Sequence, residues 1–303
     1  MSEAAWGIPI VLYLFLSSLA AGSFRFSVLA SRKQGRGFEI CSRIGAFIAP
    51  ISISLGVMLL IFDLKYKTRV WMLFGVFNYK SPLSVGVWLL TLFIFISLAY
   101  AIFWLPDNTR ARIPLIGKWP LWKRTEFREG IGKFGIPVAM LVSVYTGVLL
   151  AVSSLPLWRN VGLPILFSLL AMSTGSAGAA VLALYFSGSE RRNIMSAPLH
   201  YLQQSYRIIL PFYLLSVVLY TVLLFISVNR QEKAFEIILG WKGLVWFAGA
   251  VVIAVVMPLI LTIGRKKLSL LQIYIVSSLL LVGDILLRAY LVIAGQAYLN
   301  ITW

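Results

Sequence analysis

Few side chains in this sequence could take part in acid–base or redox chemistry, and those that could lie inside or beside long apolar segments. Asp284 and Arg288 are four residues apart, which places them on one face of a helix. Asp63 directly follows an apolar segment, and Tyr145 lies inside another. Ionisable groups are costly in an apolar environment, so these residues are candidates for proton transfer or ligand binding.

Each candidate also has a structural interpretation. Asp284 and Arg288 can neutralise each other as a buried ion pair. Asp63 can pair with the basic residues that follow it in the sequence. Tyr145 can be an interfacial tyrosine instead of a ligand donor, and its residue type does not separate the two roles. Arg25, near the end of the first apolar segment, is expected to extend toward lipid headgroups.

The segments that must position these residues indicate an all-α integral membrane protein. Of 303 residues, 60% are hydrophobic and 12% are charged. A membrane span needs about 20 apolar residues, and runs of about this length predict eight transmembrane helices, with little chain left for a soluble catalytic domain. The predicted helices are Ile8–Leu29, Ile44–Phe62, Leu83–Leu105, Ile131–Ser153, Val161–Phe186, Ile208–Val228, Leu244–Ile263 and Leu268–Ala294.

The distribution of basic residues predicts the topology. Of 27 Lys and Arg residues, 17 fall in the loops after the first, third, fifth and seventh predicted helices, and 8 in the other loops. This excess marks the cytoplasmic side, so both termini are expected on the outer side of a bacterial or archaeal cytoplasmic membrane. The net charge of +17 is then a topological signal and a lipid contact, and no nucleic-acid partner is expected.

A long basic connection divides the predicted helices into two groups of four. We expect one membrane domain over residues 1–303, with a first four-helix bundle in about 6–105 and 131–155 and a second in 160–298. Small residues recur at four-residue spacing, which allows helix backbones to approach closely. They are Ser18 and Gly22 in the first helix, and Ala171, Gly175 and Ala179 in the fifth.

The sequence also excludes several kinds of site. His200 is the single histidine, so paired axial histidine ligands for haem are impossible. Cys41 is the single cysteine, which excludes an intramolecular disulfide and a thiolate cluster. Motifs typical of hydrolases and nucleotide-binding proteins are absent from the sequence. The chain is therefore expected to bind neither haem nor metal.

With this topology, polar and aromatic residues from several helices fall at the same outer level. They are Trp6 just before the first helix and Pro9 within it, Asp63 after the second, Tyr145 in the fourth and Ser168 in the fifth. A quinone head group has two carbonyl acceptors, which become hydroxyl donors on reduction. A phenol such as that of Tyr145 can hydrogen-bond to either form inside an apolar pocket.

Several motifs resemble the NrfD/PsrC family of membrane anchors from polysulfide-reductase-type complexes. The resemblance lies in the segment 63–88, in Trp6-Gly7-Ile8 with Leu19-Ala20-Ala21-Gly22, in Tyr145-Thr146-Gly147 with Pro156-Leu157-Trp158, and in Leu163-Pro164. It covers about residues 6–180. It implies an eight-helix anchor with a quinone site near the side that docks an iron–sulfur subunit, which serves a molybdopterin catalytic subunit. The quinone-contacting tyrosine of the family corresponds to Tyr145, whereas a histidine that the family can supply from the first helix is missing here.

These expectations combine into one functional hypothesis. The chain would be the anchor and quinol-binding subunit of a respiratory molybdenum/iron–sulfur oxidoreductase. It would oxidise menaquinol or ubiquinol and pass the electrons to an iron–sulfur partner, as in polysulfide or thiosulfate reductases. Tyr145, Trp6, Pro9 and Ser168 would bind the quinone, and Asp63, Asp284 and Arg288 would transfer protons. One alternative is a secondary transporter that uses Asp284 and Arg288 as midplane coupling groups. Another is a purely structural anchor with no quinone chemistry.

Overall fold

The computed structural model describes residues 6–63, 75, 78–106, 109, 112, 125–153, 155, 157–186, 194–228, 240–264 and 267–297, and the regular structure in these ranges is entirely helical. Within them, eight helices are long and apolar enough to cross a membrane, which confirms the predicted fold class. The helices are α1 (Ile8–Ala30), α2 (Arg36–Asp63), α4 (Pro82–Ile102), α7 (Thr125–Ala151), α8 (Gly162–Phe186), α10 (Ser196–Val228), α12 (Trp241–Val251), α13 (Met257–Ile263) and α14 (Leu270–Ala297). A π-helical turn, Val252–Val256, joins α12 to α13, so that these three segments form one span.

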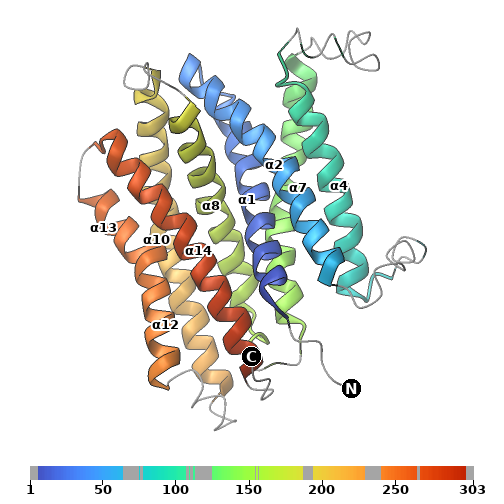
Figure 1. Ribbon diagram of the computed structural model, residues 1–303, viewed down its shortest axis with the longest axis vertical. Coiled ribbons are helices and arrows are strands. Elements are labelled where there is room, and N and C mark those ends of the chain that lie inside the picture. The colour runs from blue at the N-terminus through green and yellow to red at the C-terminus, as the bar shows by residue number, and fades with distance from the viewer. Residues whose placement is uncertain are drawn as a thin grey trace.

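Helices α1 and α8 lie at the centre of the molecule (Figure 1). Helix α1 packs against α2, α7, α8 and α14, and α8 also contacts α7, α10 and α14. Helix α4 lies outside α2 and α7, while α12 and α13 lie against α14. The start of α1 and the end of α14 lie at the same end of the molecule, the lower end in Figure 1, which we call the terminal end. The division into two bundles and the membrane side of the termini stay predictions.

The two central helices touch along their backbones. A Cβ atom added to Gly22 would collide with the backbone of Ala171 and Gly175, and one added to Gly175 would collide with the backbone of Gly22 and Ser23. The prediction that the four-residue spacing of small residues brings helices together is therefore confirmed for this pair. The close contact fixes α1 against α8, and both helices carry polar residues that bind α14.

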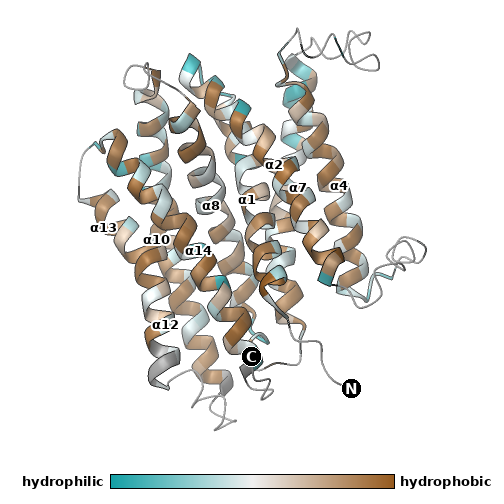
Figure 2. Ribbon diagram, in the orientation of Figure 1, coloured by the Kyte–Doolittle hydropathy of each residue, from teal (hydrophilic) through white to brown (hydrophobic). Residues whose placement is uncertain are grey.

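Three helices begin well before the apolar runs that predicted them. Helix α2 starts at Arg36 instead of Ile44, α7 at Thr125 instead of Ile131, and α10 at Ser196 instead of Ile208. The added turns are polar, and Figure 2 shows hydrophilic residues gathered at the upper helix ends, with hydrophobic residues along most of the middle. Hydropathy detects only the apolar part of such a helix, whereas backbone hydrogen bonding continues into the polar region.

Candidate functional site

A buried ion pair, Asp284 with Arg288, lies near the midpoint of helix α14. Asp284 and Arg288 have no exposed surface, and the Arg288 Nε atom lies 2.7 Å from Asp284 Oδ1. Asp284 is near the midpoint of α14, Leu270–Ala297. Each charge compensates the other, which lowers the cost of keeping both away from water.

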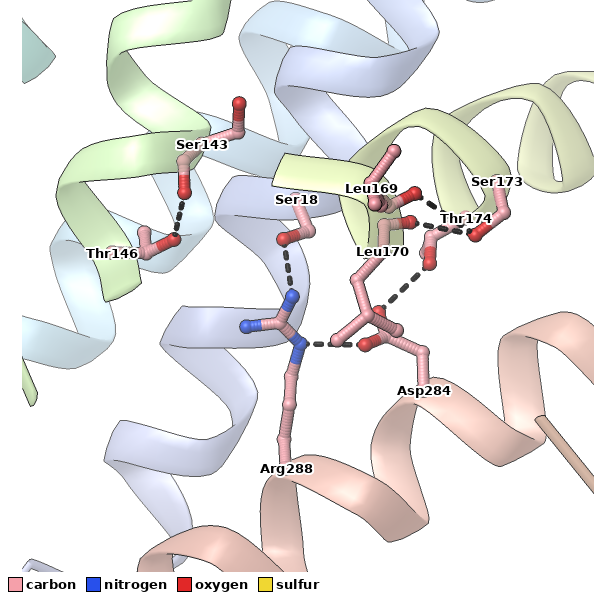
Figure 3. Close-up of polar contacts among 9 residues, drawn as sticks. All are labelled: Ser18, Ser143, Thr146, Leu169, Leu170, Ser173, Thr174, Asp284 and Arg288. Carbon is pink, nitrogen blue, oxygen red and sulfur yellow. Dashed lines mark hydrogen bonds and ion pairs between the residues drawn. The ribbon is translucent and has the colours of Figure 1, made fainter. Parts of the chain in front are cut away.

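Residues of two further helices contact this pair (Figure 3). Arg288 Nη2 donates a 2.5 Å hydrogen bond to the hydroxyl of Ser18 on α1. The hydroxyl of Thr174 on α8 donates to Asp284 Oδ2 at 2.9 Å. The guanidinium also lies over the Phe167 ring, 4.3 Å from its centroid. The pair thus joins α14 to both central helices, while Arg288 Nη1 has no hydrogen-bond partner among the described residues.

Helix α10 carries three buried tyrosines that were not predicted from the sequence, and one of them lies near the ion pair. Tyr206, Tyr213 and Tyr220 follow one another at intervals of seven residues, and none has exposed surface. The Tyr206 hydroxyl forms a 3.1 Å hydrogen bond with the hydroxyl of Ser277 on α14. The Tyr213 hydroxyl lies within electrostatic reach of the ion pair and makes no hydrogen bond in the described part of the chain. The regular spacing was the signal that could have revealed this face.

The second polar group lies nearer the terminal end and centres on Tyr145. This side chain is 7% exposed, and its phenol packs against Gly86 of α4, where a Cβ atom would collide with the hydroxyl. Tyr13 of α1 is fully buried and lies close enough to Tyr145 for the two to interact electrostatically. Neither hydroxyl makes a hydrogen bond of normal geometry to any described residue.

Helix α1 connects the two groups. The Ser17 hydroxyl lies beside that of Tyr13, although neither atom makes a hydrogen bond of normal geometry within the described ranges. The next residue, Ser18, accepts the hydrogen bond from Arg288. Buried polar groups are normally satisfied by protein or ordered water. The unpaired hydroxyls of Tyr13 and Ser17 are therefore suited to bind a polar ligand or water.

The other predicted site residues are less closely associated with Tyr145. The Trp6 ring lies against that of Trp158, with ring centroids 4.8 Å apart and the planes tilted by 38°, and the Trp6 backbone exchanges hydrogen bonds with the Gln296 side chain on α14. Pro9 is half-buried in the first turn of α1. The contacts of Trp6 with Gln296 hold this residue, which precedes α1, against α14, so Trp6 has a structural role at the terminal end.

Asp63 and Ser168 are not joined to the Tyr145 group by a hydrogen bond within the described ranges. Asp63 is exposed at the end of α2, and the neighbouring basic residues Lys65, Lys67 and Arg69 lie outside the described residues. Ser168 is half-buried on α8. Both residues belong to the parts of α2 and α8 nearest the terminal end, as Figure 1 shows for the two helices.

Arg25 does not reach the surface, contrary to the expectation from its position. It is only 5% exposed, and its Nε atom donates to the carbonyl of Ala21 at 3.2 Å. Its Nη1 and Nη2 atoms have no partner among the described residues. The physical reason is the place of α1 in the fold, because neighbouring helices enclose it.

Comparison with known proteins gives matches along nearly the whole chain. The family model described as "Polysulphide reductase, NrfD" matches residues 1–300. One chain of the polysulfide reductase of Wolinella succinogenes is 27% identical, over 99% of this chain and 96% of its own length. Protein NrfD of Escherichia coli is 26% identical, over 96% and 95%. One subunit of the selenate reductase of Mesobacillus selenatarsenatis is 24% identical, over 88% of this chain and 68% of its own length.

Proposed function

Since the chain belongs to the polysulphide reductase NrfD family, we propose that it is the membrane anchor and quinol-binding subunit of a respiratory oxidoreductase complex. The similarity to proteins named as parts of polysulfide and selenate reductases supports the assignment to a complex. The observation that carries quinol binding is the pair of phenols, Tyr13 and Tyr145, which lie within electrostatic reach of each other and make no hydrogen bond of normal geometry to any described residue.

The hydroxyls of Tyr145 and Tyr13 match the hydrogen-bonding chemistry of the head group of menaquinone or ubiquinone. When bound, such a quinone supplies a carrier of two electrons and two protons. The Tyr145 hydroxyl donates to a quinone carbonyl or accepts from a quinol hydroxyl, and the second phenol offers the same chemistry on α1. Gly86 leaves the space that the Tyr145 phenol occupies. Trp6, Pro9 and Ser168 belong to the same end of the helices and would border the approach of the ring.

Quinol oxidation releases protons, and three residues are proposed to accept or transfer them. Asp63 is exposed at the end of α2, where it can pass a proton to water. Asp284 and Arg288 lie deeper, and Ser18 and Ser17 connect them to Tyr13 along α1. Water bound to the unpaired hydroxyls would complete this connection.

The proposed complex lies in a bacterial or archaeal cytoplasmic membrane with both termini of this chain on the outer side. An iron–sulfur subunit would dock at the terminal end, near Tyr145, and would pass electrons to a molybdopterin catalytic subunit. The terminal substrate class is a sulfur compound or another inorganic oxyanion, by analogy with the names of the relatives.

Tyr145→Phe is the direct test of the quinol site. Loss of one hydrogen bond to the head group is expected to lower quinol-dependent reductase activity of the purified complex about tenfold. Activity with a soluble dye that reduces the catalytic subunit directly should not change. Tyr185→Phe is the control, because Tyr185 is 70% exposed. Full quinol-dependent activity in Tyr145→Phe would leave the chain as an anchor without a quinone site.

Gly86→Ala tests the same site without removing the hydroxyl. The new Cβ atom collides with the Tyr145 phenol, so the ring must move, and quinol-dependent activity is expected to fall about as far as in Tyr145→Phe. Gly130→Ala is the matched control, since nothing lies within 4 Å of a Cβ atom at that position of α7. The assay compares quinol and dye as electron donors in both variants. Equal quinol-dependent activity in Gly86→Ala and Gly130→Ala would show that the position of the Tyr145 ring does not matter for quinol oxidation.

A transporter is the second candidate, and one observation favours it. The buried pair lies near the middle of α14, and the preceding residue, Gly283, packs against Ala254 in the π-helical turn. Interrupted helices beside midplane charges are typical of secondary transporters. Ion flux into liposomes that contain this chain alone would support a transporter, whereas flux that requires quinol and the complete complex would favour the redox function.

A further inference from the structure

A large cavity lies between the beginnings of α10 and α14, far from the Tyr145 group. Its volume is about 690 Å³, and its walls include His200 and Gln203 of α10 and the segment 267–271 that leads into α14. This end of the helices is opposite the terminal end (Figure 1). The cavity is therefore separate from the proposed quinol site.

The chemistry of the cavity favours an anion. Lys267 lines it, is exposed and ends the sequence Arg265-Lys266-Lys267. The His200 ring nitrogen Nε2 lies 3.0 Å from the Gln204 amide and belongs to the same wall. Two long helices begin here, and the first turn of a helix presents N–H groups and a partial positive charge. Neither Asp nor Glu occurs among the described residues of the lining.

Hydrogen bonds hold the walls in place. Gln203 is 1% exposed, and its Oε1 atom accepts from the Leu268 N–H at 3.0 Å, which ties the start of α14 to α10. Ser269 and Gln272 cap α14 reciprocally, with backbone-to-side-chain distances of 3.0 and 3.3 Å. This is the arrangement of a capping box. The cavity is thus formed by fixed elements.

The remaining walls are apolar and continue onto the outside of the helices. Leu199, Leu268, Leu270 and Leu271 line the cavity beside the polar groups. Leu271 is 67% exposed, and further along the same two helices Ile208 is 64% and Ile275 42% exposed. A ligand held here would meet positive charge at one end and an apolar helix surface at the other. Free phosphate would fill little of this volume and would not use the apolar walls.

We propose that this cavity binds the headgroup of an anionic phospholipid, whose acyl chains lie along the exposed apolar residues of α10 and α14. Lys267, His200 and the first turn of α14 would contact the phosphate. Basic pockets between transmembrane helices are suited to such headgroups. The bound lipid would hold the beginnings of α10 and α14 together at the membrane surface, independently of any quinone chemistry.

The test measures which lipids stay bound to the full-length chain. The purified protein is stripped of lipid, exposed to phosphatidylglycerol or phosphatidylcholine with identical acyl chains, and examined by native mass spectrometry. We expect phosphatidylglycerol to be retained preferentially, and Lys267→Ala to lower its retention about fivefold. Lys80→Ala is the control, because Lys80 is an exposed lysine at the opposite end.

Three results would overturn the proposal. The first is equal retention of the two lipids, and the second is retention that Lys267→Ala does not change. The third is displacement of phosphatidylglycerol by millimolar inorganic phosphate, which would assign the cavity to a small anion. A phospholipid site would be supported if phosphatidylglycerol stays bound in the presence of phosphate and if its retention falls in Lys267→Ala but not in Lys80→Ala.

Discussion

Asp284→Leu is expected to lower the free energy of unfolding by about 3–5 kcal/mol, because it leaves the Arg288 guanidinium buried without its counter-charge. Arg288 would keep the hydrogen bond to Ser18 and the Phe167 ring, but neither contact supplies negative charge. The Thr174 hydroxyl would also lose its acceptor. Denaturant unfolding in detergent, followed by tryptophan fluorescence, measures the change.

Two further variants show whether charge compensation is the cause. The double variant Asp284→Leu with Arg288→Met should recover most of the lost stability, since it removes both charges and keeps the volume apolar. Arg25→Met should raise stability, because Arg25 is a buried cation for which the described residues provide no ion pair. If Asp284→Leu is no less stable than the double variant, the pair does not stabilise the protein through charge compensation.

The same double variant separates the two interpretations of the ion pair. A structural pair can be replaced by apolar residues without loss of quinol-dependent activity, provided that the protein folds. A proton-transfer pair cannot be replaced, because the apolar side chains neither accept nor donate protons. A stable double variant with activity on dye and none on quinol would therefore assign Asp284 and Arg288 to the proton route.

The fold was largely predictable because membrane spans must be long and apolar. All eight predicted spans are present among the described helices, and Ser81 with Pro82 marks the start of α4, where Ser81 accepts a hydrogen bond from the Ser84 N–H. The polar first turns of α2, α7 and α10 were missed, since nothing in their hydropathy distinguishes a helix from a loop. The Asp63–Trp88 stretch lies only partly within the described residues.

The candidate site was predictable in part. Asp284 and Arg288 could be paired from their spacing alone, because four residues make about one helical turn. Ser18, Thr174 and Tyr13 could not be assigned to their partners, since those contacts depend on how α1, α8, α7 and α14 rotate against one another. Whether the Arg25 side chain is buried or reaches the surface also depends on how the helices pack around α1. A snorkelling arginine requires a lipid-facing helix, and the sequence did not reveal that α1 is central.

Gly175→Val is expected to destabilise the protein by about 3 kcal/mol or more, because the added side chain meets the backbone of Gly22 and Ser23. A clash with backbone cannot be relieved by a change of rotamer, so α1 and α8 must separate. Gly249→Val is the matched control, since nothing lies within 4 Å of a Cβ atom at that position. Denaturant unfolding of the two variants in detergent gives the comparison.

The separation should also disturb the ion pair, which distinguishes this variant from an ordinary packing defect. Thr174, which binds Asp284, is the neighbour of Gly175, and Ser18, which binds Arg288, lies one turn from Gly22. Both polar contacts depend on the close approach of α1 and α8. In the complex, Gly175→Val is therefore expected to reduce quinol-dependent activity while Gly249→Val keeps it. Stability and activity equal to those of Gly249→Val would show that the contact between the two helices is not what positions these groups.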